Sequence, residues 1–163
     1  LDYTPLDGKD AVAVNEMSHL ATDIVREHFD PLIGKAQNDY MLARFQTQQA
    51  IEEQIAHGSR YYFVRENGQD AGFVAFYPRD GKMYLSKFYL KKEMRGKGYA
   101  HEMLSFVLDE TKKAGLPAVF LNVNRYNDAC RAYEALGFTV ARYEVNDIGN
   151  GFVMDDAVYE YTL

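Results

Sequence analysis

The chain has 163 residues, of which 47% are hydrophobic and 26% are charged, values typical of one globular domain with a sizeable core. No apolar run approaches the length of a membrane span and no signal-like segment stands at the N-terminus, so we expect a cytoplasmic protein without a membrane partner. The net charge of −6 argues against a nucleic-acid partner, which would need a basic face, and is easier to reconcile with a cationic substrate.

The first part of the chain predicts a short strand and a long helix. Residues 1–4 fit the strand, and Asp10 can cap a helix whose apolar residues recur at helical spacing as far as Val25. Because proline disfavours helical geometry in the residue before it, this helix should end near Pro31.

Two further helices are expected before the first hairpin. Asn38 or Asp39 can cap the second helix, which presents an apolar face. Thr47 begins the third helical stretch, and Gly58 ends it as a C-terminal glycine.

Three strands come next. Residues 61–65 and 71–77 flank Asn67-Gly68, the strongest short signal for a β-hairpin. A second turn at 79–81 leads into the apolar, aromatic run 83–90. We predict that these three strands pair in antiparallel fashion.

The second half of the chain predicts alternating helices and strands. In chain order, these are a helix over 99–114, a strand over 117–123, a helix over 127–136, and strands over 138–145 and 152–162 joined by a loop at 146–151. A helix between strands 83–90 and 117–123 implies that these two strands are parallel. No internal repeat, low-complexity segment or linker interrupts the pattern, so we predict one α/β domain over 1–163.

Cysteine and histidine offer little redox or metal chemistry. Cys130 is the only cysteine, which excludes an internal disulfide and suits a reducing cytosol. Inside the predicted helix 127–136, it is best interpreted as a small buried hydrophobic residue. The four histidines form no metal-ligand spacing, so we predict no metal site.

A glycine-bearing turn, Arg95–Ala100, joins strand 83–90 to the next helix. Gly96 and Gly98 allow backbone N–H groups to turn inward, and the helix N-terminus adds unpaired N–H groups, so the turn can bind a phosphate. It is not a Walker loop, because Gly98 follows Lys97 where a serine or threonine is needed. It is not a dinucleotide fingerprint either, because the last glycine is replaced by His101.

The turn resembles motif A of the GCN5-related N-acetyltransferase (GNAT) superfamily, Gln/Arg-x-x-Gly-x-Gly/Ala, which Arg95–Ala100 fits at every fixed position. A second match follows at the family's spacing: a strand ending at Asn124, then Asn127, a helix that carries Tyr133, and Gly137-Phe138 before the next strand. Two matches in order are far more specific than one short glycine motif.

The resemblance implies a fold and a co-substrate. The fold is α/β (α+β), with a mixed, mostly antiparallel sheet of about seven strands flanked by about four helices. In this superfamily the two parallel strands, here 83–90 and 117–123, splay apart. The pantetheine arm of acetyl-CoA then enters the split as a pseudo-strand, because unpaired backbone groups of the two strands need partners.

The resemblance also implies roles for particular residues. Those implied to bind acetyl-CoA are Phe88, Leu90, Arg95, Gly96, Lys97, Gly98, Tyr99, Ala100, Asn124, Asn127 and Arg131. Phe88 and Leu90 would offer backbone groups to pantetheine and the acetyl carbonyl, and the amides of 95–100 would hold the pyrophosphate. Asn127 could instead cap the following helix, and Arg131 could be a solvated helix residue. Tyr133 would protonate the leaving thiolate, although it could also serve only for packing.

The general base is left open. A primary amine with a pKa of about 10.4 must lose a proton before attack, which costs roughly 4.6 kcal/mol at about pH 7. Many relatives use a glutamate on the strand before motif A, but here that strand offers Tyr84, Ser86 and Lys87. A water chain could do the work, or a carboxylate from elsewhere, such as Glu27, Asp30 or Asp39.

The acceptor is expected to be a small-molecule amine. Segments 26–40 and 85–90 are loosely similar to bacterial polyamine (spermidine and spermine) acetyltransferases. The candidate acceptor residues are Asp30, Tyr40 and Tyr84, with Asp39, Asp155 and Asp156 as further acids and Phe29 and Phe45 as further aromatics. Ordinary surface acids and core aromatics explain the same residues. A non-catalytic CoA-binding sensor, or an enzyme acting on protein or peptide amines, are the alternatives, and a homodimer is possible.

Overall fold

The computed structural model describes the backbone of residues 1–163 and every side chain except those of His28, Phe29, Leu32 and Phe45. The predicted role of Phe29 and Phe45 in an acceptor cleft therefore lies outside the described residues. The chain forms two compact units, which we describe one at a time. The first comprises residues 1–77 and 87–99, and the second comprises residues 78–86 and 100–163.

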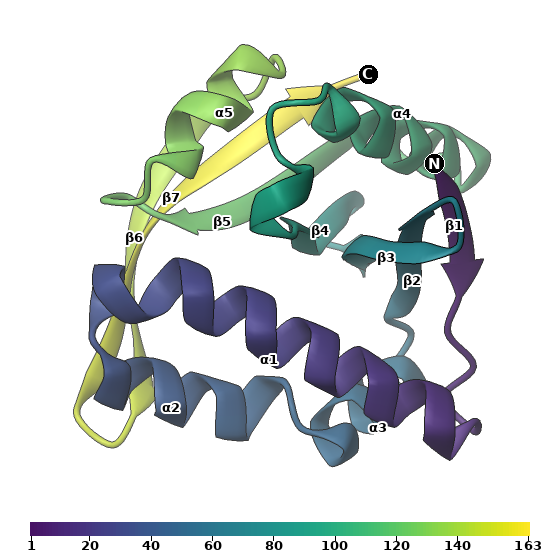
Figure 1. Cartoon of the computed structure of the whole chain (residues 1–163). Helices are drawn as coiled ribbons and strands as arrows, with labels where there is room; N and C mark the ends of the chain where they lie inside the picture. The colour runs from purple at the N-terminus through teal and green to yellow at the C-terminus, as the bar shows by residue number, and fades with distance from the viewer. The chain divides into compact units, whose positions relative to one another are not determined.

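The chain contains seven strands, five α-helices and one short 3-10 helix (Figure 1). In order they are β1 (Asp2–Pro5), α1 (Ala11–Ile33), α2 (Lys35–Phe45), α3 (Gln48–Ala56), β2 (Arg60–Glu66), β3 (Gln69–Arg79), β4 (Lys82–Leu90), η1 (Lys92–Met94), α4 (Tyr99–Lys113), β5 (Ala118–Asn124), α5 (Ala129–Ala135), β6 (Thr139–Gly149) and β7 (Phe152–Thr162). The strand order is β1-β2-β3-β4-β5-β7-β6. Pairs β1–β2, β2–β3, β5–β7 and β6–β7 are antiparallel and β4–β5 is parallel, which confirms the predicted mixed sheet.

In the first unit, α1 begins where the sequence predicts and ends slightly later. The Asp10 carboxylate accepts a hydrogen bond from the Ala13 amide at 3.1 Å, as expected of an N-cap. The helix continues through Pro31 to Ile33, and the Gly34 amide closes it on the Asp30 carbonyl at 3.1 Å. A proline this close to the end removes little of the helical hydrogen bonding, so it does not stop the helix.

The prediction for the start of α2 was wrong. The helix begins at Lys35, directly after Gly34 at φ 86°, and Asn38 lies inside it. The Asn38 side chain is fully buried and donates to the Asp30 carboxylate at 2.6 Å and to the Val25 carbonyl at 3.3 Å. Asn38 therefore ties α2 to α1 instead of capping a helix.

The start of α3 and the first hairpin follow the prediction. Thr47 caps α3, because its hydroxyl accepts from the Ala50 amide at 3.1 Å. Asn67 and Gly68 both have positive φ, 50° and 80°, as a tight two-residue hairpin requires. The buried core of this unit includes Leu6, Val14, Met17, Leu20, Ala21 and Ile24 from the N-terminal part of the chain, Ile51 of α3, Tyr61 and Phe63 of β2, and Phe73 and Ala75 of β3.

In the second unit, β5 pairs very differently with its two neighbours. Its parallel pairing with β4 is limited to Met83 with Val119 and Tyr84 with Phe120. Its antiparallel pairing with β7 extends over the whole strand, from Ala118 to Asn124. The strands β4 and β5 are thus paired only near their beginnings, which agrees with the predicted splay.

The final hairpin is longer than the sequence predicts. Strand β6 continues to Gly149, and the turn is reduced to Asn150-Gly151, both with positive φ. Within this unit α4 and α5 lie on the same side of β5 and β7 (Figure 1). On that side the Tyr159 hydroxyl donates to Glu134 of α5 at 3.0 Å. Because side chains alternate along a strand, the even-numbered residues of β7 face the opposite side.

Candidate active site

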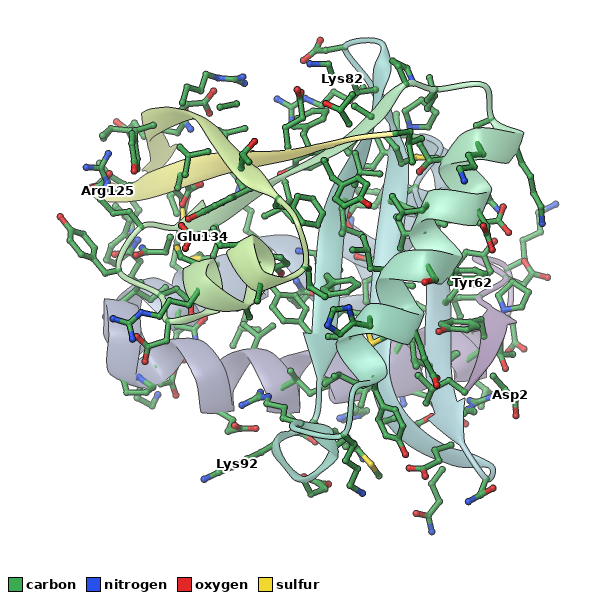
Figure 2. All side chains as sticks on the ribbon, turned by 90° about the horizontal axis from the view of Figure 1, so that it is seen from above. Asp2, Tyr62, Lys82, Lys92, Arg125 and Glu134 are labelled. Carbon is green, nitrogen blue, oxygen red and sulfur yellow. The ribbon has the colours of Figure 1, made fainter. Side chains whose placement is uncertain are left out.

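In the first unit, the loop between β4 and α4 has the backbone of an anion-binding turn. Gly96 and Gly98 lie at φ 78° and 81°, in the left-handed region that other residues rarely adopt. A Cβ at either position would meet nothing within 4 Å, so the backbone conformation, and not lack of space, requires glycine. Lys97 between them is exposed, as is Lys92 earlier in the loop (Figure 2). The N-terminus of α4 begins directly afterwards, at Tyr99.

Arg95 fastens this loop to the end of β4. Its guanidinium donates to the Leu90 carbonyl from Nη2 at 3.0 Å and from Nε at 3.3 Å, and Nη1 pairs with Glu27 at 3.2 Å. The Arg95 amide donates to the Lys92 carbonyl at 3.3 Å. The carbonyl of Leu90 and the amide of Arg95 are therefore both engaged within the loop. Their predicted contacts with acetyl-CoA, and those of Phe88, stay predictions.

The end of β4 also holds a lysine with altered acidity. The end of β4 lies very close to Gly72 of β3, because a Cβ at Gly72 would be 2.0 Å from the Tyr89 carbonyl oxygen. Lys87 is half-buried, and desolvation by burial lowers its pKa to about 8. Sequence reasoning considered Lys87 only as a position without a carboxylate, because burial of a single lysine leaves no signal in the sequence.

In the second unit, two buried asparagines shape the turn between β5 and α5. The Asn124 side-chain oxygen accepts from the Tyr126 amide at 2.9 Å, and the Asn127 oxygen accepts from the Ala129 amide at 2.8 Å. The Asn127 amide in turn donates to the Asn124 carbonyl at 2.9 Å. Asn127 thus binds the first residue of α5, as its capping role predicts. The role of both residues toward pantetheine stays a prediction.

Tyr133 on α5 is half-buried and makes aromatic contacts. Its ring meets Phe138 edge-on at a centroid distance of 5.7 Å and lies 6.3 Å from the Tyr159 ring. Packing is therefore one of its functions, and its role toward the departing thiolate stays a prediction. On the preceding turn of the helix, the Cys130 sulfur lies 3.6 Å from the Asn124 carbonyl oxygen, and burial raises the pKa of this thiol. That favours the interpretation of Cys130 as a packing residue.

The two arginines near α5 differ in their contacts. Arg125 follows β5 (Figure 2) and pairs with Asp155 at 2.7 Å. Its guanidinium carbon lies 4.5 Å from the centroid of the Tyr143 ring. Arg131 is exposed on α5, which is compatible both with phosphate binding and with a solvated helix residue.

The acceptor candidates of the first unit are held by neighbouring side chains. Asp30 accepts from Asn38, and Asp39 accepts from Arg26 and from Lys35, the latter at 2.9 Å. The bonds from Lys35 and Arg26 lower the pKa of Asp39. The Tyr40 hydroxyl accepts from Arg44 at 3.5 Å. These acids link α1 to α2, a function that the sequence pattern did not indicate.

The face of the second unit opposite α5 carries a different set of polar residues. Tyr84 packs its ring at 4.9 Å from Phe120. Asp156 of β7 stands directly between Asn124 of β5 and Glu144 of β6 in the strand register. Sequence reasoning named Asp156 only as an acid that could attract a polycation and did not detect its burial, because that depends on pairing between strands distant in sequence.

Asp156 is only 3% exposed, and its two oxygens have different surroundings. One accepts from the Asn122 side chain at 3.4 Å, while Oδ1 is buried without a hydrogen-bond partner among the described residues. Burial raises the pKa of Asp156, and the nearby Glu144 and Asp155 raise it further. Hydrogen bonds from Arg142 and Asn146 lower the pKa of Glu144.

Two further observations bear on the predicted absences. Among the described side chains, no group of three histidines, cysteines or acids is placed to hold a metal ion. The helices that the structure describes include none that combines the length and hydropathy needed to cross a bilayer.

Comparisons with known proteins place these features in a family. The sequence matches the model of the acetyltransferase (GNAT) family over residues 22–138. No curated protein matches it. Among solved structures, the PaiA N-acetyltransferase of Thermoplasma acidophilum in complex with coenzyme A is similar over 100% of both chains, with a TM-score of 0.78 and 15% identity.

Two other solved structures give the same result. A GNAT family acetyltransferase from Elizabethkingia anophelis with acetyl-CoA bound has a TM-score of 0.67 and 13% identity, and the match covers 99% of this chain and 97% of that one. An aminoglycoside 6'-acetyltransferase type Ii has a TM-score of 0.64 and 15% identity at the same coverage. Likeness at such low identity supports the fold, while the family match covers most of the sequence. The chain therefore belongs to the GNAT family of acyl-CoA-dependent N-acetyltransferases.

Proposed function

We propose that the chain transfers the acetyl group of acetyl-CoA to a primary amine of a small cationic acceptor, such as a polyamine, by direct attack in a ternary complex. The main support is the short pairing between β4 and β5, which ends at Tyr84 and Phe120. From Leu121 to Asn124, β5 pairs with β7, and no β4 partner is described on its other edge. Backbone groups on such an edge need a partner, and the two amides of pantetheine suit them.

The loop before α4 supports binding of the pyrophosphate. The left-handed conformations of Gly96 and Gly98 let successive amides point the same way, and open space surrounds both glycines. The first turn of α4 adds further unpaired N–H groups and the positive end of a helix dipole. Lys97 of the same loop is exposed and can add positive charge to this binding.

Tyr133 is our candidate for the general acid. In the reaction the amine nitrogen bonds to the carbonyl carbon of the thioester and the bond from that carbon to sulfur breaks. A tyrosine hydroxyl, with a pKa of about 10, is a weaker acid than a thiol at about 8.5, so its proton passes to the departing thiolate as the tyrosine oxygen recovers one from the nitrogen that becomes an amide. The packing of the Tyr133 ring against Phe138 would hold the hydroxyl in a fixed direction.

A cationic acceptor fits the charge of the chain. The net charge is −6, which favours a polycationic acceptor over an anionic acceptor. Polyamines carry several primary and secondary ammonium groups and no acid. The carboxylate of Asp156, buried on the face that also carries Tyr84, can attract a cation locally.

The experiment that tests this function follows free thiol while the protein is incubated with acetyl-CoA and one amine at a time. Spermidine, putrescine, lysine, glycine and a short peptide would cover small polycations, amino acids and protein-like amines. We expect thiol release that depends on the enzyme and is fastest with the polyamines. Release with the peptide alone would move the acceptor class to protein amines. Coenzyme A binding without release above hydrolysis would favour a non-catalytic sensor.

A further inference from the structure

The carboxylate of Asp156 is buried, and only one of its two oxygens has a hydrogen-bond partner among the described residues. It lies on the central strand of the β5-β7-β6 group and is 3% exposed. The neighbouring Glu144 adds a second negative charge. Burying an ionised carboxylate this way destabilises a fold unless a positive or hydrogen-bonding group compensates it.

Three other acids that the sequence suggested for the acceptor or the base already have hydrogen-bond or ion-pair partners. Asp30 accepts from Asn38, and Asp39 is bound by Arg26 and Lys35. Glu27, another candidate for the base, is paired with Arg95 at 3.2 Å. Asp156 differs from all three, because its buried Oδ1 has no donor among the described side chains.

The other charged groups near Asp156 form ion pairs with partners of their own. On β6, the Arg142 guanidinium forms its ion pair with Glu144, at 2.7 Å, and not with Asp156. On β7, Asp155 is paired with Arg125 and Glu160 is paired with Lys82. On β5, the nearest donor is the amide of Asn122, whose nitrogen lies 3.4 Å from Oδ2 and 3.5 Å from a Glu144 oxygen.

The position of Asp156 also relates it to the predicted co-substrate site. In the β5–β7 register Asp156 is the direct partner of Asn124, which is predicted to hold pantetheine. Directly opposed residues of an antiparallel pair share a face of the sheet, so the carboxylate lies beside the predicted path of the thioester arm. The aromatic pair Tyr84 and Phe120 lies on β4 and β5 of the same unit.

We propose that Asp156 is the general base of the reaction: its unpartnered oxygen binds the ammonium group of the acceptor and accepts its proton, with Glu144 and Asn122 as positioning residues. This inference rests on the proposed function, because it assigns the base for the same acetyl transfer. The family resemblance left this role open, since β4 carries no carboxylate in this chain.

Each proton that leaves the acceptor nitrogen has a defined destination. The Asp156 carboxylate takes one proton from the ammonium, and the neutral amine then attacks the thioester carbonyl carbon. As the carbon–sulfur bond breaks, Tyr133 gives its proton to sulfur and recovers one from the nitrogen that has become an amide. Asp156 later passes its proton to water. A pKa raised by burial makes the Asp156 carboxylate a stronger base than that of an ordinary aspartate.

The decisive variant is Asp156→Asn, compared with Asp109→Asn as a matched control. Asp109 is an exposed acid on α4, and its substitution changes the net charge equally. With spermidine as acceptor at about pH 7, we expect kcat/KM to fall by about 10²- to 10⁴-fold in Asp156→Asn and by less than about twofold in Asp109→Asn. Calorimetric affinity for coenzyme A should be unchanged in both variants.

The pH profile separates a base from a merely structural residue. Without Asp156 the enzyme must use the rare neutral amine from solution, so kcat/KM should rise about tenfold per pH unit toward the amine pKa near about 10. In Glu144→Gln a negative neighbour is lost and the pKa of Asp156 should fall. The acidic limb of the profile should therefore move to lower pH, and the maximum rate should fall as well, because Asp156 becomes a weaker base and loses a positioning residue.

Stability gives a readout that does not depend on the acceptor. The pKa of Asp156 is raised in the folded state, so its ionisation opposes folding above that pKa, and this penalty disappears as the pH falls below the unfolded value of about 3.9. The melting temperature of Asp156→Asn should be at least that of the wild type at about pH 8. The advantage should vanish at about pH 4 or below.

The results distinguish this inference from the proposed function. A wild type that acetylates spermidine, with an Asp156→Asn variant of equal rate and profile, overturns the inference alone. If the acidic limb of the kcat/KM profile disappears in Lys87→Met and stays in Asp156→Asn, the general base is Lys87 and the inference is overturned. A wild type that neither acetylates nor binds spermidine in calorimetry removes both. If the wild type binds spermidine without acetylating it, and Asp156→Asn loses this binding, Asp156 is part of an ammonium-binding site and the proposed acetyl transfer is rejected.

Discussion

Tyr133 has a ring and a hydroxyl whose contributions can be measured separately. The ring contacts Phe138 and Tyr159, so replacement by phenylalanine keeps the packing and removes only the proton. We expect Tyr133→Phe to lower kcat by about a hundredfold, within the usual range for loss of a general acid, with little change in melting temperature. Tyr133→Leu is the companion variant that also disturbs the packing. An unchanged kcat in Tyr133→Phe would leave the residue a packing role only.

Lys87 should reduce the stability of the protein at neutral pH. Its pKa is lowered to about 8, so the folded state disfavours the charged form, and the penalty is complete below that pH. The penalty disappears as the pH rises past the unfolded value of about 10.4. Since the side chain is only half-buried, we expect Lys87→Met to raise the free energy of unfolding by about 1–2 kcal/mol at about pH 7. Urea titrations at about pH 7 and about pH 10.5 should show the gain only in the first.

Residues whose role is local were predicted better than those whose role depends on distant pairing. Asp10 and Thr47 bond amides three residues away, so the local pattern is sufficient to identify them as caps. Asn38 has the same cap preference, yet the packing of α2 against α1 buries it inside a helix. The burial of Asp156 results from its pairing with β5 and β6, which no local pattern encodes.

At the scale of elements, the loop before α4 can be compared with another turn of the same chain. Gly98 and Gly81 have nearly the same φ, 81° and 76°, and a Cβ at either position would meet nothing within 4 Å. Alanine should therefore strain both backbones by about 1–2 kcal/mol. We expect Gly98→Ala to weaken coenzyme A binding by about tenfold or more and Gly81→Ala to leave it unchanged. Equal calorimetric affinities in the two variants would contradict a phosphate-binding role for the loop.

The element order was predictable, whereas some element ends were not. Hairpin and glycine signals located β2, β3 and α4 to within two residues, because tight turns and helix ends require particular residues. Strand β6 extends to Gly149 because pairing with β7 overrides the polar, turn-rich composition of residues 146–149. The short pairing between β4 and β5 was predicted through the family resemblance, since the residues alone do not specify where two strands part.

At the scale of the whole molecule, the chain should unfold as one domain although it contains two compact units. Strand β4 contributes Lys82–Ser86 to one unit and Lys87–Leu90 to the other, so neither unit can lose β4 without affecting the second. Helix α4 is shared in the same way at its first residue. Scanning calorimetry should therefore show a single transition whose calorimetric and van't Hoff enthalpies agree. Two resolved transitions would contradict the prediction of a single domain over residues 1–163.

Coenzyme A should stabilise the molecule as a whole. A ligand that binds only the folded state adds about 2.7 kcal/mol at a concentration of about 100 times its Kd. For a chain of this size the melting temperature should then rise by about 5–10 °C. Adenosine, which lacks the pyrophosphate and the pantetheine arm, should have little effect at the same concentration. Because Asp156 is assigned to the acceptor and Gly98 to the phosphates, Asp156→Asn should keep the full shift and Gly98→Ala should lose part of it. A shift lost in Asp156→Asn would instead place that carboxylate at the co-substrate.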